Sequence, residues 1–577
     1  MKFSNVFTIT YFATIACVVR AALPPAPRQN AAPTVKVYNG SYVGASQPGL
    51  GSEAFLGMPY AQPPVGAFRL RQPQSLNVSW TGAHDATKWG NVCPGVGISS
   101  TSNASYAQNY VLNEDCLNIN IIRPAGIDAG ANLPVLFWIY GGGFTQGTAE
   151  DPRYNGSYLV QRSVEQGKPI IFASINYRLN AFGFPAGQKA ADEGLLNLGI
   201  RDQRLALHWV QENIYYFGGD PTAVTIWGQS AGGISCVLHM IAYGGRDDGL
   251  FRASQVDSGI FLNGNASLTT AAPGWNKFVN ATGCSNATDT LNCLRSVPYG
   301  TYYNASINTA FAPSVIPDGD ILQSPIPQLI EEGKFVKRCA IFGSNQDEGT
   351  AGIGAPTGIN TDAQFLSVVA NTWQSLGISN ATIQQFRTLW PDDPADGSPH
   401  NTGDGTASTG FQDKRVFSLY TDAVTAGTRL FSKAHSAVAP TWSYRFWQIP
   451  DNSSIELGAY HLAEVPYFMG VLNRTARNPL GYRPDTLALS QMMQTFLINY
   501  VNTGNPNEGT AVSLNWPSYA TSQQALVFLR RNASYAIDDN YRNPQIKFLT
   551  EIALGVTPVS TSYTETRSSR SGLTLDA

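Results

Sequence analysis

The sequence predicts an α/β fold, in which one large domain is built on a mostly parallel central sheet flanked by helices. Nearly continuous apolar runs recur along the chain, and helix-like segments separate them. Strands that are apolar on both sides are typical of parallel sheets covered on both faces. The runs expected to form strands are 133–140, 169–177, 222–228, 251–257, 337–344 and 441–447.

The composition fits a large core and argues against several classes of partner. The chain has 577 residues, of which 43% are hydrophobic and 13% charged, and its net charge is −3. Because no basic run or stripe is present, nucleic acid is not expected as a partner. No feature of the sequence specifies an oligomeric state.

The N-terminus has the features of a cleaved secretion signal. Lys2 precedes an apolar stretch at 6–19, and small residues follow near Ala21. The stretch is short for a membrane span and leads into a proline-rich segment, so no stable membrane anchor is expected. We therefore predict a signal peptide at 1–21, one large extracellular domain at 22–556, and a disordered tail at 557–577 with little to bury.

Glycosylation signals are abundant beyond this segment. Twelve N-x-[ST] sequences have no proline at the middle position, as expected of a secreted glycoprotein. The candidate sites are Asn39, Asn77, Asn103, Asn155, Asn265, Asn280, Asn286, Asn304, Asn380, Asn452, Asn473 and Asn532.

Six cysteines lie outside the predicted signal peptide, and an oxidising compartment favours disulfides among them. Cys284 and Cys293 flank a polar loop, and Cys93 and Cys116 flank a Gly/Ser-rich stretch. We expect these two pairs to be bridged, whereas Cys236 and Cys339 lie in apolar runs and are expected to be buried free thiols. No cysteine or histidine cluster has the spacing of a zinc site, and no metal or cofactor is expected.

The stretch IWGQSAGG at 226–233 places Ser230 between an expected strand and an expected helix. A strand, a tight glycine-containing turn and a helix form the context in which G-x-S-x-G presents a nucleophilic serine. The alternative is a small-residue bend of purely structural importance. The glycines of YGGGFTQG, at 140–147, follow another expected strand and could direct backbone N–H groups at a developing oxyanion.

A serine nucleophile needs a base and an orienting acid. His461 lies in a loop after the last of these apolar runs, in the Ser–acid–His order of this architecture. The stretch GSNQDEGT follows the expected strand at 337–344 and offers both Asp347 and Glu348. The residue chemistry alone does not choose between these two acids.

The motifs together identify a resemblance. FLGMPYAQPPVGAFRL, EDCLNINI, NYRLNAFGF, IRDQRLALHWVQENI, GQSAGG, GSNQDEGT and GAYH occur in the order found in the type-B carboxylesterase/lipase family, which includes cholinesterases and secreted fungal esterases and lipases. The resemblance covers residues 35 to 550 approximately. It implies a single α/β-hydrolase domain that cleaves small-molecule esters.

Carried over by motif, the resemblance implies Ser230 as nucleophile, Glu348 as acid and His461 as base. Backbone N–H groups of Gly142, Gly143 and Ala231 would form the oxyanion hole. The two cysteine pairs named above match family disulfides, and Arg69 with Glu114 matches a family salt bridge. Ser258 matches a second serine near the histidine loop.

Two departures from the family bear on the substrate. Gln229 stands where cholinesterases have glutamate, and the stretch at 94–115 has no tryptophan for a quaternary ammonium, although Tyr106 or Tyr110 could partly substitute. This stretch is shorter than the lid of typical fungal lipases and carries Asn103. We therefore expect short to medium acyl esters.

Other functions are kept as alternatives. They are a lipase acting on triacylglycerols or sterol esters, an esterase specialised for a lactone, toxin or phenolic ester, and a catalytically inactive adhesion protein on the same fold.

Overall fold

The computed structural model describes residues 32–96, 110–262, 266–309, 311–400, 402, 412–471, 483–509, 512–530 and 533–558. The predicted signal peptide and all but the first two residues of the predicted tail lie outside these ranges. So do Tyr106 and four of the candidate glycosylation sites: Asn103, Asn265, Asn473 and Asn532.

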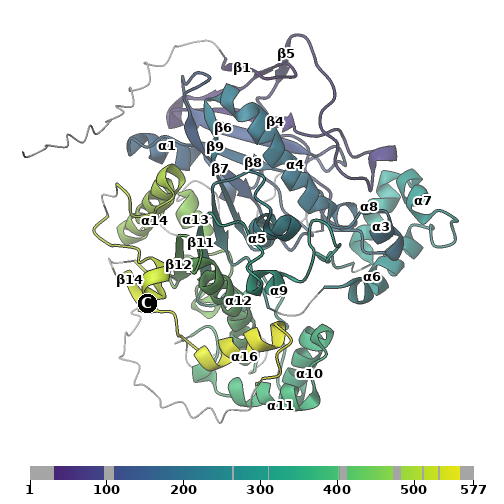
Figure 1. Ribbon diagram of the computed structural model, residues 1–577, viewed down its shortest axis with the longest axis vertical. Coiled ribbons are helices and arrows are strands. Elements are labelled where there is room, and N and C mark those ends of the chain that lie inside the picture. The colour runs from purple at the N-terminus through teal and green to yellow at the C-terminus, as the bar shows by residue number, and fades with distance from the viewer. Residues whose placement is uncertain are drawn as a thin grey trace, which may run out of the picture.

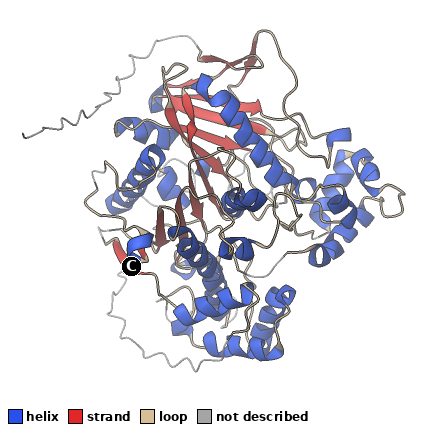
Figure 2. Cartoon of the chain, viewed as in Figure 1, coloured by secondary structure: helices blue, strands red, loops and turns tan. Residues whose placement is uncertain are grey.

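An eleven-stranded sheet runs through the molecule in the order β14-β13-β12-β11-β10-β9-β7-β8-β6-β4-β3 (Figures 1 and 2). The seven strands from β13 to β8 are mutually parallel, and antiparallel strands lie at both edges. The strands are β3 (Ala45–Gln47), β4 (Ser52–Pro59), β6 (Asn118–Pro124), β7 (Leu133–Ile139), β8 (Ile171–Ile175), β9 (Gly219–Gln229), β10 (Ala253–Asp257), β11 (Cys339–Asn345), β12 (Thr441–Phe446), β13 (Gln524–Phe528) and β14 (Tyr535–Asp538).

The six apolar runs of the sequence correspond to the central strands β7 to β12, so the predicted mostly parallel α/β architecture is confirmed. Strands β8, β10 and β12 are buried along their whole length, as expected where helices cover both faces. A separate three-stranded sheet near the N-terminus joins β1 (Thr34–Lys36), β2 (Ser41–Val43) and β5 (Ala83–Asp85).

Helices cover the central sheet on both faces (Figure 2). Helices α5 and α12 pack against β9 to β12, while α1 and α14 pack against β6 to β9. The helices are α1 (Ser157–Glu165), α2 (Asn180–Gly183), α3 (Gln188–Asp192), α4 (Leu198–Asn213), α5 (Ala231–Gly245), α6 (Leu268–Ala281), α7 (Thr290–Ser296), α8 (Tyr299–Asn308), α9 (Ile326–Glu331), α10 (Asp362–Trp373), α11 (Asn380–Leu389), α12 (Asp413–Ser436), α13 (Val465–Met469), α14 (Pro484–Thr503), α15 (Tyr519–Ser522) and α16 (Asn543–Ala553).

A second apolar cluster lies beside the main core, where α6, α7 and α8 pack with α3 (Figure 1). Its centre is aromatic, and the ring of Phe278 lies 5.0 Å from those of Trp275 and Tyr302. This part of the chain therefore forms an appendage on the main domain, while β11, further along, returns to the central sheet.

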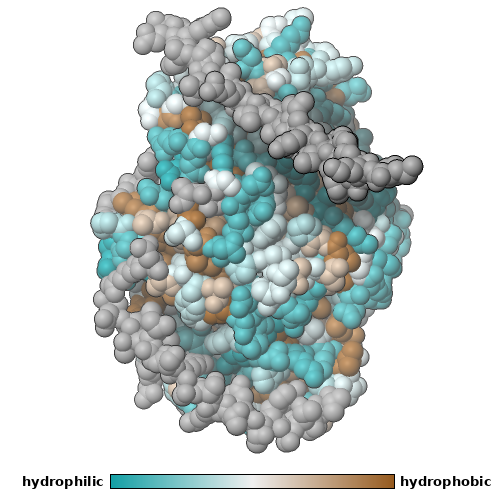
Figure 3. All heavy atoms as spheres, turned by 60° about the vertical axis from the view of Figure 1, so that its left-hand side comes forward, coloured by the Kyte–Doolittle hydropathy of each residue, from teal (hydrophilic) through white to brown (hydrophobic). Residues whose placement is uncertain are grey.

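The surface mixes polar and apolar residues, and Figure 3 shows the apolar ones dispersed among hydrophilic neighbours on the face in view. Among the described residues, none of the helices has the length and apolar character needed to cross a lipid bilayer.

Candidate active site

Ser230 lies at the junction of β9 and α5, on a sharp turn. Its φ of 57° and ψ of −126° are unusual for a residue with a side chain. The turn also brings Gly228 against Gly232, since a Cβ at Gly228 would lie 2.3 Å from the Gly232 carbonyl oxygen. The backbone N–H of Ser230 donates to the carbonyl of Asp257 at 2.9 Å, which ties the turn to β10. These contacts place the serine at the carboxyl end of the central strand.

The glycine loop after β7 packs directly against this turn. A Cβ at Gly141 would lie 2.8 Å from the Cβ of Ser230, so a larger residue does not fit there. Gly142 and Gly143 have φ values of 113° and 63°, and within the described residues their N–H groups donate no hydrogen bond. Ala231 begins α5, where the first backbone N–H groups lack intrahelical acceptors. All three predicted oxyanion donors therefore lie on segments flanking Ser230.

Glu348 and His461 form a direct contact. The Nδ1 atom of the imidazole lies 2.5 Å from Oε2 of Glu348, and both side chains are buried. The other oxygen, Oε1, accepts hydrogen bonds from the Ser258 hydroxyl at 2.5 Å and from the Asn345 N–H at 2.7 Å. One carboxylate oxygen is therefore held by Ser258, just after β10, and by Asn345 of β11. The other oxygen contacts the imidazole.

Asp347, the neighbouring acid, points elsewhere. Its carboxylate accepts hydrogen bonds from the Ser398 hydroxyl at 2.8 Å and from the backbone N–H groups of His400 and Ala459 at 3.1 and 3.0 Å. Burial raises the pKa of Asp347, and these hydrogen bonds oppose that shift. The side chain thus links three loop segments rather than contacting the imidazole.

The other face of the imidazole meets Gln229. The carboxamide nitrogen of Gln229 lies 3.2 Å from Nε2 of His461 and 3.5 Å from Nδ1. Within the described residues, the Ser230 hydroxyl makes no hydrogen bond to His461. The structure therefore brings Glu348 and His461 together, and the carboxamide of Gln229 also lies against the imidazole. The sequence identified Gln229 as a departure from the cholinesterases but gave no sign of this contact.

Two further buried carboxyl groups, which the sequence analysis missed, surround Glu348. Asp257 accepts a hydrogen bond from the Trp227 indole N–H at 2.6 Å, and Asn345 donates to Glu464. Burial raises the pKa of Asp257 to about 7 and also raises that of Glu464, and the charge of Glu348 adds to both shifts. Their positions in the sequence could have indicated them, since Asp257 directly precedes Ser258 and Glu464 lies three positions after His461.

The other histidines make different contacts. His239 is buried on α5 beside Gln203, and desolvation lowers its pKa to about 3. His435 contacts the Thr441 hydroxyl, and desolvation lowers its pKa to about 4. His84 stacks on Trp80 in the small N-terminal sheet. None of these contacts involves the turn at Ser230.

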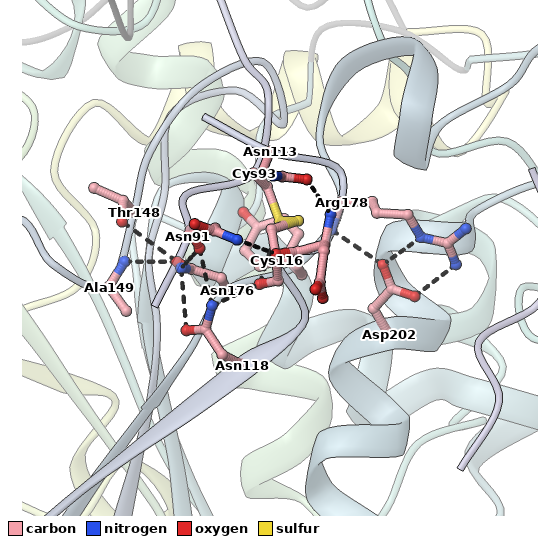
Figure 4. The surroundings of a disulfide bond; sticks show 12 residues. Asn91, Cys93, Asn113, Cys116, Asn118, Thr148, Ala149, Asn176, Arg178 and Asp202 are labelled. Carbon is pink, nitrogen blue, oxygen red and sulfur yellow. Dashed lines mark hydrogen bonds and ion pairs between the residues drawn. A yellow bond between two sulfur atoms is a disulfide. The ribbon is translucent and has the colours of Figure 1, made fainter. Parts of the chain in front are cut away.

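The disulfide between Cys93 and Cys116 closes a loop, as Figure 4 shows. Close to the disulfide, the Val96 N–H donates to the Thr145 carbonyl of the glycine loop at 2.8 Å. Asn118 and Asn176 both donate to the carbonyl of Asn91, at 2.9 and 3.1 Å, and anchor this loop to β6 and β8. Most of the loop, residues 97–109, lies outside the described ranges. These two asparagines therefore hold the base of the loop against the central sheet.

A buried ion pair supports the same region. The guanidinium of Arg69 contacts both oxygens of Glu114, at 2.5 and 2.6 Å, and donates to the carbonyl of Leu294 at 2.9 Å. The expected salt bridge is present, and it connects the disulfide loop to α7.

The second expected disulfide joins Cys284 and Cys293 between α6 and α7. Cys236 and Cys339 are free, as expected. Cys236 is buried, but Cys339 is only partly buried because it begins β11, so the expectation of full burial was wrong for this residue.

No group of three or more His, Cys, Asp or Glu side chains is arranged to hold a metal ion in the described part of the chain. The groups brought together at this site are a serine hydroxyl, an imidazole, carboxyl groups and backbone N–H groups.

Comparison with known proteins places the chain among ester hydrolases. The model of the Carboxylesterase family matches residues 31–549. "Secreted lipase 1" of Botryotinia fuckeliana is 34% identical over 91% of this chain and 94% of its own length. "Secreted triacylglycerol lipase LIP1" of Gibberella zeae is 32% identical over 92% of each. The solved structure of Aspergillus niger EstA is similar with a TM-score of 0.79 and 26% identity, covering 92% of this chain and all of that one.

Proposed function

Because this chain belongs to the carboxylesterase family and is a carboxylic ester hydrolase, we propose that Ser230, His461 and Glu348 form its catalytic triad. The observation that carries the proposal is the 2.5 Å contact between Glu348 and His461 beside the strained turn of Ser230. In this role Glu348 fixes the orientation of the imidazole and stabilises its charged form.

The reaction proceeds in two steps through an acyl-enzyme. His461 accepts the Ser230 proton while the hydroxyl oxygen attacks the ester carbonyl, and it then donates this proton to the departing alcohol. Water subsequently attacks the acyl group by the same route and releases the acid. This sequence requires only proton transfers and acyl transfer, so the proposal includes no cofactor.

The backbone N–H groups of Gly142, Gly143 and Ala231 are the proposed oxyanion hole. The unused N–H groups of the two glycines support this role, as does the close packing of Gly141 on Ser230. Preorganised donors of this kind commonly contribute about a hundredfold or more to the rate. No side chain is needed, which is consistent with a glycine-rich loop.

Short to medium acyl esters remain our proposed substrates. Gln229 brings no negative charge to the imidazole, and the disulfide loop is short, as the sequence analysis noted. A lipase acting on triacylglycerols is the second candidate, because similar fungal proteins are named as lipases.

Secretion is also part of the proposal. A signal peptide at 1–21 would be removed to release the domain at 22–556, and two relatives are named as secreted. The two disulfides support an oxidising compartment.

Six of the proposed glycosylation sites carry exposed side chains, and Asn39 and Asn155 are partly exposed. The exposed ones are Asn77, Asn280, Asn286, Asn304, Asn380 and Asn452.

The triad is tested by measuring p-nitrophenyl ester hydrolysis by the wild type, Ser230→Ala and His461→Ala. Each substitution is expected to lower kcat about a thousandfold or more. Full activity in either folded variant would refute the triad.

The substrate class is tested with a series of p-nitrophenyl esters, from acetate to palmitate, beside emulsified triacylglycerol. Faster cleavage of the emulsion than of short esters would favour the lipase.

A further inference from the structure

Gly352 lies beside the edge of the His461 ring that faces away from Glu348. A Cβ at Gly352 would lie 3.2 Å from Cδ2 of His461 and 3.3 Å from its Cβ, but 3.6 Å from Cγ, the atom that joins those two. Because the joining atom is the farthest of the three, the added Cβ would lie close to the plane of the ring. The imidazole therefore has Glu348 at its Nδ1 edge, at 2.5 Å, and the backbone of Gly352 at the opposite edge.

One face of the same ring is covered by Gln229. The carboxamide nitrogen lies 3.2 Å from Nε2 and 3.5 Å from Nδ1 of His461. An atom in the ring plane at these distances would overlap Cε1, so the nitrogen lies over the face. Both side chains are buried, and close packing leaves neither of them free to move aside. The imidazole is thus bounded at two edges and on one face.

The segment that carries Gly352 is anchored on both sides. Two positions earlier, the Thr350 hydroxyl donates to the carbonyl of Leu457 at 2.6 Å. One position later, Ile353 packs against the main core. The backbone of Gly352 is therefore held in place, and an added side chain would displace the imidazole.

We propose that Gly352 is a positioning residue, which sets the orientation of the His461 imidazole by leaving space for its Cδ2 edge. The inference rests on the proposed role of His461 as the base. An added Cβ cannot push the ring sideways in its own plane, because Glu348 already lies at 2.5 Å on the far side. The ring would instead tilt away from Gln229, and Nε2 would leave the position from which it takes the Ser230 proton.

Gly352→Ala tests the proposal, and Gly354→Ala is its matched control. The two glycines have φ values of 88° and 72°, so an alanine strains the backbone at either position. Only at Gly352 does the added Cβ meet the imidazole, because a Cβ at Gly354 has nothing within 4 Å.

The expected effect on catalysis follows from the size of the overlap. Carbon atoms in contact prefer a separation of about 3.5 Å or more, so the ring of His461 should move by a few tenths of an ångström. Misplacement of a reacting group by about 1 Å costs about a hundredfold in rate. We therefore expect kcat for p-nitrophenyl butyrate to fall about threefold to tenfold in Gly352→Ala, with a smaller change in KM. Gly354→Ala should keep the wild-type kcat.

The proton between His461 Nδ1 and Glu348 provides a second readout, which a general loss of stability would not move. Its ¹H resonance, far downfield because the hydrogen bond is short, should shift in Gly352→Ala and stay in place in Gly354→Ala. The same kcat and the same resonance in both folded variants would overturn the inference.

If Gly352→Ala does not fold, Gly352→Asn provides the second variant and Gly354→Asn its control, because asparagine tolerates a positive φ better than alanine. The added Cβ is the same, so the same loss of kcat and the same shift of the resonance are expected. Failure of the proposed function has a different signature, because a folded His461→Ala would then keep its activity. An inactive His461→Ala, together with Gly352 variants that match their Gly354 controls, would refute the positioning role alone.

Discussion

The Glu348 carboxylate lies 2.5 Å from the Nδ1 atom of His461, although 113 positions separate the two residues. Backbone pairing brings them together, because Asp347 and Tyr460 form a parallel bridge immediately before each residue. The Asn345 side chain reinforces the pairing by donating to the Tyr460 carbonyl at 2.8 Å. The contact is therefore a product of the loop backbone and does not depend on the two side chains alone.

Replacing the two adjacent acids should separate catalysis from structure. Glu348→Gln should lower kcat about a thousandfold to ten-thousandfold, because an amide neither enforces the tautomer of His461 nor stabilises its charge. Asp347→Asn should mainly lower the thermal unfolding midpoint, because it weakens the contacts with Ser398 and Ala459. Steady-state kinetics and thermal unfolding of both variants distinguish these effects. The assignment fails if Asp347→Asn abolishes turnover in a folded protein while Glu348→Gln remains active.

Removal of the Ser258 hydroxyl should weaken the orientation of Glu348. Ser258→Ala deletes a 2.5 Å hydrogen bond to the carboxylate, and loss of one charge-assisted hydrogen bond predicts a fall in kcat of about tenfold. Ser254→Ala is the control, since this serine lies on β10, which ends just before Ser258, and in the described structure its hydroxyl donates only to the Met240 sulfur. Equal kcat values for both variants and the wild type would remove Ser258 from the catalytic arrangement.

Asp257 should make the stability of the protein depend on pH. Burial raises its pKa to about 7 in the folded state, whereas an unfolded aspartate has a pKa of about 4. Between these values the folded state binds more protons than the unfolded state. Stability is therefore greatest below the unfolded pKa and falls as pH rises to about 7, by up to about 1.4 kcal/mol per unit.

Asp257→Asn cannot titrate and should lose this slope. Urea unfolding at pH 5 and pH 7.5 should show that the variant gains stability relative to the wild type at the higher pH. Parallel changes in the two proteins between these pH values would show that Asp257 is ionised throughout.

The disulfide between Cys284 and Cys293 should contribute to stability and not to catalysis. Its short ring joins α6 to α7 in the appendage, and loop-closure entropy predicts a contribution of about 2 to 3 kcal/mol. The double variant Cys284→Ala/Cys293→Ala should unfold at a lower temperature and keep its kcat. A large loss of kcat below the unfolding temperature would connect the appendage to the active site.

The central strands could be predicted from the sequence because each is buried on both sides and so appears as an apolar run. The antiparallel edge formed by β6, β4 and β3 could not be derived in this way. β3 is short and partly exposed, and β4 was evident only as part of a family motif. Hydrophobic patterning carries less information where burial is less uniform.

The residues of the proposed triad could be named from motifs, but their contacts could not. The choice between Asp347 and Glu348 depended on the family resemblance, since two adjacent carboxylates have the same chemistry. Their different directions follow from the loop backbone after β11. The contact of Gln229 with His461 depends on side-chain rotamers, which leave no periodic signal in the sequence.

The central claim is that Ser230 is the residue that carries the acyl group, and mass spectrometry tests it most directly. Wild-type enzyme is mixed with excess p-nitrophenyl butyrate, quenched with acid within the first turnovers and digested. The claim predicts a butyryl adduct on the peptide containing Ser230, and no such adduct in Ser230→Ala. The amount of the wild-type adduct should increase when the reaction is run at low pH. Hydrolysis by a folded Ser230→Ala at the wild-type rate, or an adduct on another residue, would contradict it.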